Sequence, residues 1–260
     1  MNALLSDKNP LVKQVRKAVA KGSLTDDGFC VAEGFHLLEE ALKTSAEIGA
    51  VIVAESVQDA VEDMLHRERD LRIAAVRDAD FTGLSSTETP QGVLALVKPP
   101  AWTMDDVFRA RALVAVLEGI QDPGNAGAIL RAAEAFGATG AIFLKGSVSP
   151  FNPKCLRGSA GSMFRLPLVA SVKAADLLGV VEKKNVALYA AMPRADRFAA
   201  DADLRESCAI VIGSEGKGVS AALAAKATGV RIPTTNVESL NAAVAAGILF
   251  YEARRQRNVQ

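Results

Sequence analysis

The sequence is poor in the two residue types that most often bind metals or act as bases at neutral pH. It has two histidines, His36 and His66, and three cysteines, Cys30, Cys155 and Cys208, none of them in a C-x-x-C pair. A structural zinc site needs about four such ligands. We therefore expect no metal site and three reduced thiols. Because both histidines lie early in the chain, a histidine general base is excluded from the C-terminal part.

Long apolar runs are also missing. The sequence has no apolar stretch of about eighteen residues, so it predicts no membrane span. Its first residues lack the apolar segment of a signal peptide. We expect a cytoplasmic protein that makes no membrane contact. With 260 residues, 50% of them hydrophobic, the chain can form one large domain or two of ordinary size.

The net charge of zero conceals an asymmetry. Residues 1–110 carry 12 Lys and Arg against 18 Asp and Glu, and residues 111–260 carry 18 against 12. A basic half is typical of proteins that bind a polyanion. Ordinary solvated surface explains the same charges, and both interpretations stay open. A basic N-terminal arm, in which Asp7 is the one acid, raises the same question: Lys8, Lys13, Arg16, Lys17 and Lys21.

Strands alternate with helices along the first hundred or so residues. Apolar runs predict strands at 29–32, 50–53, 71–76 and 92–97, and the patterns between them predict helices at 10–20, 33–43 and 57–69. This alternation is typical of a small α/β domain, which we place at residues 1–97. Lys98-Pro-Pro then marks a linker at 98–110, because proline suits neither a helix interior nor a sheet centre. Trp102 is expected to anchor this linker against one domain.

Residues 111–260 predict a second α/β domain with a parallel sheet. Its strands are continuous apolar runs rather than alternating ones, as in a sheet that is buried on both sides. We expect strands or extended segments at 112–118, 141–144, 166–170, 186–190, 209–213 and 230–232. We expect a loop at 119–127 and helices at 128–136, 154–163, 173–183 and from 242 onwards.

The first candidate for chemistry is the segment from Asp122 to Arg131. It follows a strand and opens a helix, so its backbone N–H groups form a natural anion site. Arg131 is predicted in the second turn of that helix, on an otherwise apolar segment. It either forms a structural ion pair with Glu134 or Glu118, or points a cation at a phosphate or a developing oxyanion.

The second candidate is the loop after the strand at 209–213. Its stretch from Gly216 to Ala221 superficially fits a dinucleotide-binding pattern, but too few residues follow it for a doubly wound half. A P-loop is excluded because Gly218 is followed by Val219 rather than lysine. Glu215 stands among glycines, where it either binds a hydroxyl or amine or holds the loop.

The third candidate is the segment 236–241 with the helix that follows. Ser239 suits the N-cap of this helix, and the small residues at 242–247 let a backbone or a ligand approach closely. Its apolar stripe is predicted at Leu240, Val244, Ile248 and Tyr251. For the arginines near its end, solvation and the helix dipole give the better interpretation: Arg254, Arg255 and Arg257.

Together, the three segments resemble the motifs of the SpoU (TrmH-type) branch of the SPOUT RNA methyltransferases. They match it at 125–133, 212–218 and 232–245, in the family's order. The loop between Pro233 and Ser239 departs from members that have a methionine and a glycine there. The N-terminal part resembles the family's substrate-binding domain, related to the ribosomal protein L30e fold, at 9–13, 33–41 and 89–95.

This resemblance implies S-adenosyl-methionine-dependent methylation of a ribose 2′-hydroxyl in structured RNA, with rRNA favoured over tRNA, by a homodimer. It implies a parallel sheet with helices on both faces, whose C-terminal segment is threaded into a trefoil knot, an exception to the usual rule. Arg131 matches the residue thought to orient or activate the 2′-hydroxyl. The other matched polar positions are Asn125, Glu215, Ser239 and Asn241. The matched donor-binding positions are Gly213, Ser214, Gly218, Ile232, Pro233 and Leu240.

These residue types are compatible with that chemistry. A methyl sulfonium is already a good methyl donor, so the protein must mainly align the acceptor oxygen and stabilise its growing negative charge. Neither a metal nor a histidine is required. Two alternatives remain. One is a non-catalytic RNA-binding protein of the same fold, and the other is a nicotinamide-dinucleotide enzyme that uses Gly216 and Gly218.

Overall fold

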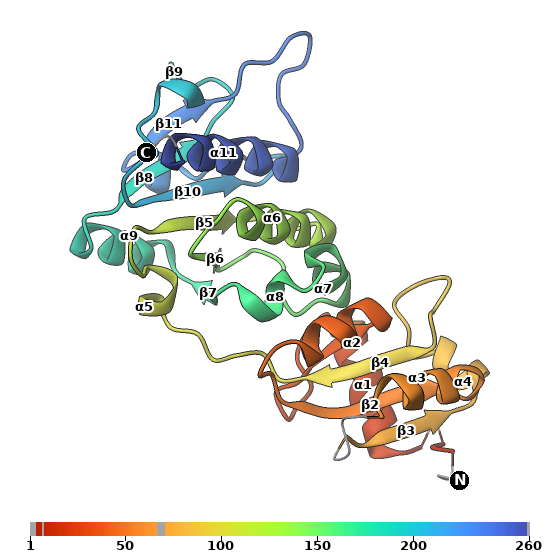
Figure 1. Cartoon of the computed structure of the whole chain (residues 1–260). Coiled ribbons are helices and arrows are strands. Elements are labelled where there is room, and N and C mark those ends of the chain that lie inside the picture. The colour runs from red at the N-terminus through yellow and green to blue at the C-terminus, as the bar shows by residue number, and fades with distance from the viewer. Residues whose placement is uncertain (1–3, 7, 67–70, 259–260) are drawn as a thin grey trace. The chain divides into compact units, whose positions relative to one another are not determined.

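The structure is a computed structural model that describes residues 4–6, 8–66 and 71–258. It divides into two compact units (Figure 1). The first comprises Met1–Pro100 together with Phe151–Phe164, and the second comprises Ala101–Pro150 together with Arg165–Gln260. A segment from the middle of the chain therefore belongs to the same unit as the N-terminal residues.

The first unit is built on a four-stranded sheet with the order β1-β4-β2-β3. β4 pairs with β1 and β2 in antiparallel fashion, and β2 pairs with β3 in parallel. Its strands are β1 (Cys30–Glu33), β2 (Ile48–Ala54), β3 (Ile73–Val76) and β4 (Val93–Val97). Its helices are α1 (Pro10–Lys21), α2 (Phe35–Leu42), α3 (Gln58–Met64), α4 (Asp78–Thr82), α7 (Pro153–Ser159) and most of α8 (Ser162–Arg165), with a 3-10 turn, η1, at Glu55–Val57.

The helix α1 confirms the predicted amphipathic segment at 10–20. Val12, Val15 and Ala18 recur at helical spacing and are buried in one cluster with Ile52 and Leu94 of the sheet. The basic arm that this helix carries is partly neutralised. Lys17 forms an ion pair with Asp26 at 2.7 Å.

The second unit is built on a seven-stranded sheet with the order β7-β6-β5-β10-β8-β11-β9, in which neighbouring strands are parallel. The predicted parallel α/β architecture is therefore confirmed. The strands are β5 (Leu113–Glu118), β6 (Gly140–Leu144), β7 (Leu168–Val172), β8 (Ala187–Ala191), β9 (Arg197–Phe198), β10 (Cys208–Gly213) and β11 (Thr228–Arg231). The helices are α5 (Met104–Val107), α6 (Pro123–Ala135), α9 (Ala174–Lys183), α10 (Ala221–Ala224) and α11 (Ala242–Arg257), with a 3-10 turn, η2, at Ala199–Asp201.

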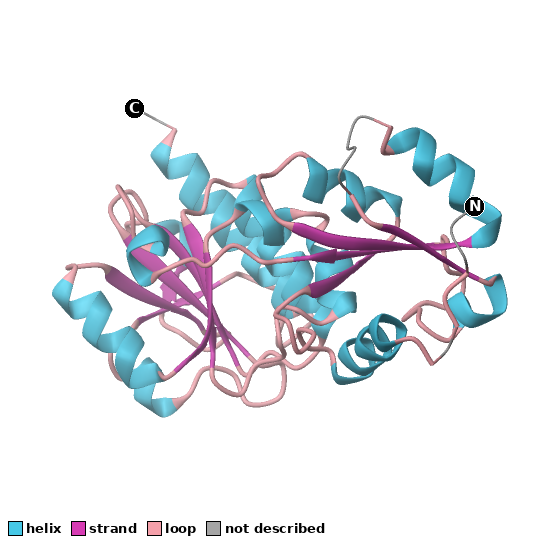
Figure 2. Ribbon diagram, turned by 90° about the horizontal axis from the view of Figure 1, so that it is seen from below, coloured by secondary structure: helices cyan, strands magenta, loops and turns pink. Residues whose placement is uncertain are grey.

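Helices cover both faces of this larger sheet (Figure 2). Alternate residues of the central strands, such as Val114, Val116 and Val211, are buried with Leu177 of α9 and Leu223 of α10. Across the sheet from them, α6 and α11 lie side by side and pack against β5 and β10. The first turns of α6 and α11 thus come close to the ends of the two central strands.

Two helices differ from the prediction for local reasons. α6 begins at Pro123 and not at 128, because Asp122 accepts a hydrogen bond from the backbone N–H of Asn125 at 2.7 Å and proline suits the first helical position. The helix predicted at 154–163 is split into α7 and α8. The break falls at Ala160 and Gly161, whose φ angles are +48° and +88°.

In the first unit, two predicted helices are shorter than expected. Glu33 ends β1, so the helix predicted from residue 33 starts later, as α2. The helix predicted at 57–69 ends at Met64, and its residues 67–69 lie outside the described residues.

Part of the predicted linker is structured. α5 starts at a capping box formed by Thr103 and Asp106. Val107 and Phe108 are buried in the core of the second unit. A helix of four residues is too short to give a periodic signal in the sequence, which is why it was not predicted. The boundaries 1–97, 98–110 and 111–260 stay a prediction.

Candidate active site

The ends of β5 and β10, neighbours at the centre of the sheet, carry the first two predicted motifs. β5 leads through residues 119–122 into α6, and β10 leads into the loop 214–220. Parallel strands end at the same edge of a sheet, so these two loops meet. Glu118, the last residue of β5, accepts a hydrogen bond from the backbone N–H of Ser220 at 2.9 Å.

Gly213 ends β10 at a point where the backbone turns back on itself. A Cβ atom at Gly213 would lie 2.3 Å from the carbonyl carbon of Gly218 and 2.4 Å from its oxygen. The backbone N–H of Gly218 donates to the carbonyl oxygen of Ser214 at 2.8 Å, and that of Lys217 donates to Ser214 Oγ at 3.2 Å. Gly218 has a φ of +65°, which favours glycine. The loop therefore presents backbone where the strand ends.

The dinucleotide-binding pattern at 216–221 does not have the helix that it requires. α10, which follows this loop, has four residues. A dinucleotide-binding turn uses the N-terminus of a full helix to hold the pyrophosphate. This geometry disfavours the nicotinamide-dinucleotide alternative.

Asn241 caps α11. Its Oδ1 accepts hydrogen bonds from the backbone N–H groups of Ala243 at 2.9 Å and Val244 at 3.3 Å. The prediction that Ser239 is the N-cap is wrong, because the chain at Ser239 and Leu240 is not yet helical. Ser239 instead lies in the loop that leads from β11 to α11.

One hydrogen-bonded group joins the three motifs. Asn125 Nδ2 donates to Glu215 Oε1 at 2.8 Å, and Asn241 Nδ2 donates to the same oxygen at 3.0 Å. Asn241 Nδ2 also donates to Asn125 Oδ1 at 3.0 Å. Glu215 Oε1 thereby holds the starts of α6 and α11 to the loop after β10. Within the described part of the chain, Glu215 Oε2 has no hydrogen-bond partner.

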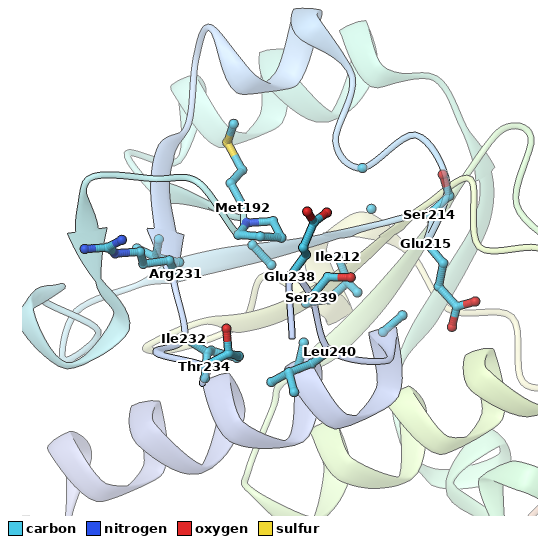
Figure 3. A pocket seen from close by; sticks show the side chains of 17 residues that line it. Met192, Ile212, Ser214, Glu215, Arg231, Ile232, Thr234, Glu238, Ser239 and Leu240 are labelled. Carbon is cyan, nitrogen blue, oxygen red and sulfur yellow. The ribbon is translucent and has the colours of Figure 1, made fainter. Parts of the chain in front are cut away.

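A first cavity lies beside this group (Figure 3). Its wall includes five of the six predicted donor-binding residues, namely Gly213, Ser214, Gly218, Ile232 and Leu240. Two predicted catalytic residues, Glu215 and Ser239, also line it. Pro233 is exposed and is not part of this wall.

Several residues of this wall were not predicted from the sequence. Ala191 ends β8 and Met192 and Pro193 follow it, while Arg231 ends β11 and Glu238 lies in the loop of the third motif. β8 lies between β10 and β11 in the sheet, so its carboxyl end meets the same edge. The rule that ligands bind at the carboxyl ends of parallel strands could have identified the residues after β8.

A second cavity, of about 510 Å³, adjoins the first and shares Ser214, Glu215 and Ala242 with it. Its remaining wall comes from the β5–α6 connection and the first turn of α6, from the loop after β6 and from the loop after β10. These residues are Gly119, Ile120, Gln121, Asp122, Asn125, Gly146, Gly216 and Lys217. The Asn125–Glu215–Asn241 group therefore stands at the boundary between two cavities.

Arg131 lies in neither cavity wall. It is exposed in the third turn of α6, not the second, because α6 starts earlier than predicted. Neither predicted ion pair forms. Glu134 pairs with Arg165 at 2.7 Å, and Glu118 is bonded to Ser220. Among the residues that the structure describes, Arg131 has no ion-pair or hydrogen-bond partner.

The predicted apolar stripe of α11 is not the buried face of this helix, so that prediction is wrong. Val244, Ile248 and Tyr251 are 51%, 38% and 55% exposed. The ring of Tyr251 contacts that of Phe136 edge to face, with centroids 5.6 Å apart. The buried face consists of Ala242, Ala246, Leu249, Phe250 and Ala253. This leaves a row of large apolar side chains on the surface of the second unit.

The interpretation of Arg257 as a solvated cation is also wrong. Its guanidinium donates to the carbonyl oxygens of Leu204 at 2.8 Å, Arg111 at 3.1 Å, Ala112 at 2.9 Å and Glu206 at 2.6 Å. Burial lowers the pKa of this guanidinium from its ordinary value. Arg257 therefore ties the end of α11 to the chain just before β5 and β10.

The three cysteines are free and buried. Burial raises the pKa of the Cys30 thiol to about 12 and that of Cys208 to about 11, so neither is a nucleophile at neutral pH. No group of three or more metal-binding side chains occurs among the described residues. No helix in the described part of the chain is both long enough and apolar enough to cross a membrane.

Known proteins resemble this chain over nearly its whole length. The family described as SpoU rRNA Methylase matches residues 112–251, and the family described as MRM3-like substrate binding domain matches residues 9–95. A protein of Synechocystis named as an uncharacterized tRNA/rRNA methyltransferase is 35% identical, over 98% of this chain and 94% of its own. The 23S rRNA (guanosine(2553)-2′-O)-methyltransferase RlmP of Bacillus subtilis is 30% identical, over 98% and 100%. The crystal structure of the SpoU methyltransferase AviRb from Streptomyces viridochromogenes with the cofactor AdoMet has a TM-score of 0.86, 27% identity and coverage of 97% and 99%.

Proposed function

Because this chain belongs to the SpoU rRNA methylase family, we propose that it methylates a ribose 2′-hydroxyl of ribosomal RNA with S-adenosyl-methionine as donor. The observation that carries this proposal is the group of Asn125, Glu215 and Asn241 at the boundary between two cavities. The Bacillus subtilis relative is named for 23S rRNA, whereas the Synechocystis relative is named for tRNA and rRNA. Transfer RNA is therefore the alternative substrate.

The first cavity fits the donor. Its apolar residues Ile212, Ile232 and Leu240 suit an adenine ring, and the close backbone approach at Gly213 leaves main-chain groups for polar contacts. When bound, S-adenosyl-methionine supplies a methyl group on a sulfonium. The residues that we assign to holding it are Gly213, Ser214, Gly218, Ile232 and Leu240. Pro233 restricts the backbone next to Ile232 and directs the loop.

The polar residues act on the acceptor hydroxyl. The amides of Asn125 and Asn241 fix Glu215 through one oxygen, and its second oxygen remains to accept a hydrogen bond from the ribose. Such positioning aligns the hydroxyl oxygen with the methyl group of the donor, and the hydroxyl proton is released on transfer. Ser239 lines the donor cavity beside them. We assign to Arg131 the orientation or activation of the 2′-hydroxyl.

A homodimer explains why Arg131 stands outside the cavities of its own chain. Arg131 is exposed and unpaired among the described residues, as a side chain that serves a second copy would be. α6, which carries it, lies beside the exposed row Val244, Ile248 and Tyr251 on α11. Exposed apolar rows of this kind mark protein interfaces. We propose that two copies meet through α6 and α11.

The proposed architecture has an RNA-binding domain at 1–97, a linker at 98–110 and a methyltransferase domain at 111–260 in a cytoplasmic protein. The two family matches, at 9–95 and 112–251, support this division. A C-terminal trefoil knot is part of the proposal. It is supported by the strand order, because β11 lies beyond β8 while α11 returns to pack against β10 and α6.

The test is methyl transfer from labelled S-adenosyl-methionine to rRNA and tRNA taken from cells that lack this protein. We expect label in rRNA, located at a ribose 2′-oxygen. Glu215→Ala should reduce the rate by about a hundredfold or more, as for the loss of one positioned polar group. Donor affinity, measured by calorimetry, should fall much less. Absence of transfer to both RNA pools by the wild-type protein would contradict the proposal.

A further inference from the structure

Methyl transfer needs a second binding site next to the donor, and the second cavity has the required position. At about 510 Å³ it lies within the range of about 300–1,000 Å³ that is typical of small-molecule sites. It meets the donor cavity at Ser214, Glu215 and Ala242. We propose that this cavity holds the target nucleotide, with Lys217 as the contact to its phosphate and Gln121 as the contact to its base. This inference rests on the function proposed above.

Lys217 is the cation of this wall. Its side chain is exposed, and no partner for it occurs among the described residues. Its backbone is fixed, because its N–H donates to Ser214 Oγ at 3.2 Å. The acids of the same wall are Asp122 and Glu215, which are bonded to Asn125. A phosphate is repelled by these acids and attracted by Lys217, so we assign the phosphate to Lys217 and the ribose to Glu215.

The amide nitrogen of Gln121 already donates hydrogen bonds within the protein. Nε2 donates to the carbonyl oxygen of Gly146 at 2.5 Å and to that of Gly119 at 3.4 Å. What this side chain can still offer a ligand is therefore its amide oxygen, an acceptor. A guanine presents two neighbouring N–H donors on its base-pairing edge, whereas uracil presents one. We infer that the cavity prefers a base with such donors, and guanine above the others.

The experiment titrates the full-length protein, saturated with S-adenosylhomocysteine, with guanosine 3′-monophosphate, guanosine and uridine 3′-monophosphate, followed by calorimetry or NMR. We expect guanosine 3′-monophosphate to bind about tenfold more tightly than guanosine or uridine 3′-monophosphate. Lys217→Ala should bind guanosine 3′-monophosphate no more tightly than guanosine, and should still prefer guanosine 3′-monophosphate to uridine 3′-monophosphate. Gln121→Ala should lose the preference for guanosine 3′-monophosphate over uridine 3′-monophosphate, and should still bind guanosine 3′-monophosphate more tightly than guanosine. Lys226→Ala, an exposed lysine outside both cavities, is the control and should change neither.

Equal affinity for guanosine with and without its phosphate, or wild-type behaviour of Lys217→Ala, would overturn the inference. So would displacement of S-adenosylhomocysteine by the nucleotides, because the two would then share one cavity. The proposed function fails differently. A protein that does not bind S-adenosylhomocysteine at all would contradict the methyltransferase proposal, and titration with the nucleotides alone would still test the second cavity.

Discussion

At Gly213 the backbone leaves no room for a side chain. A Cβ atom there would lie 2.3 Å from a backbone atom of Gly218, closer than any real contact, so the loop must move to admit it. We predict that Gly213→Ala lowers the affinity for S-adenosyl-methionine by about a hundredfold, because this loop forms the wall of the donor cavity. Calorimetry with S-adenosyl-methionine measures this loss directly.

Gly216 provides the matched control from the same loop. A Cβ atom at Gly216 would meet nothing within 4 Å, so Gly216→Ala should bind the donor within about twofold of the wild type. Thermal unfolding of both variants shows whether the fold is intact. Equal loss of donor affinity in the two variants would mean that loop flexibility, not the contact at Gly213, governs binding.

At this scale the sequence identified residues whose type is unusual for their surroundings. Glu215 stood out as a carboxylate among glycines, and the family resemblance singled out Asn125 and Asn241; the structure brings the three together. Met192 and Glu238 could not be identified in the same way. Nothing in their local pattern marks them. Met192 lines the donor cavity because β8 lies between β10 and β11, and Glu238 lines it from the loop between β11 and α11.

At the scale of elements, the end of α11 is held to the rest of the second unit by the side chain of Arg257. Arg257 donates to four backbone carbonyl groups, and Arg257→Ala removes this donor from all of them; the carbonyl of Ala112 keeps the backbone N–H of Cys208 at 2.9 Å. We predict that this change costs about 3 kcal/mol in the unfolding free energy of the second unit, since three of the four contacts are part-buried and the loss of hydrogen bonds from a charged donor is costly. Trp102, the one tryptophan of the chain, belongs to that unit and reports its unfolding in urea by fluorescence.

Arg255→Ala is the control for this prediction. Arg255 pairs with Glu252 on the exposed side of the same helix, at 2.7 Å. Pairs of this kind contribute about 0.5 kcal/mol or less. A similar loss in both variants would show that helix propensity, and not the carbonyl contacts of Arg257, holds α11 in place.

A buried carboxylate fastens α7 to β1 in the first unit. Glu33 accepts hydrogen bonds from Arg157 Nη1 at 2.9 Å, from Thr87 Oγ1 at 2.9 Å, from the backbone and side chain of Ser86, and from Ser85 Oγ. Burial alone would raise the pKa of Glu33, but the hydrogen bonds from these serines and Thr87 outweigh burial and hold the pKa below its ordinary value of 4.5. The ionised form therefore stabilises the folded unit.

This pKa shift predicts a pH dependence. Because the folded pKa is the lower one, the contribution of Glu33 is complete above the unfolded value and is lost as the pH falls through the folded value. Glu33→Gln should therefore lower the melting temperature clearly at about pH 7, and the difference from wild type should shrink below about pH 4.5. Calorimetric melts across this range check it. A constant difference at all pH values would mean that shape, not charge, matters at this position.

Element boundaries were predictable where a periodic pattern or a cap was read. The apolar spacing predicted a helix at 10–20, and α1 ends one residue later, at Lys21. α6 starts at Pro123, five residues before the predicted start, because Asp122 and Pro123 together form a helix-start signal that precedes the apolar pattern. The break between α7 and α8 at Ala160 was not predictable from residue type, since alanine seldom adopts a positive φ.

At the scale of the whole molecule, the position of Arg131 is the feature that a single chain leaves unexplained. The residue lies outside both cavities of its own chain and has no partner among the described residues. The sequence could not predict this, because spacing along a helix does not say which copy of a protein a side chain serves. If two copies meet through α6 and α11, Arg131 of one copy can serve the site of the other.

This arrangement predicts complementation between two inactive variants. Arg131→Ala keeps its donor cavity, and Gly213→Ala keeps Arg131, so a mixed dimer contains one complete site if the arginine acts across the interface. We expect each variant alone to lose about a hundredfold or more in methyl transfer. The mixed dimer, isolated with two different affinity tags, should regain about half of the wild-type rate. A mixed dimer as inactive as its parents would place Arg131 in the site of its own chain. Failure of the two tagged chains to purify together would contradict the dimer itself.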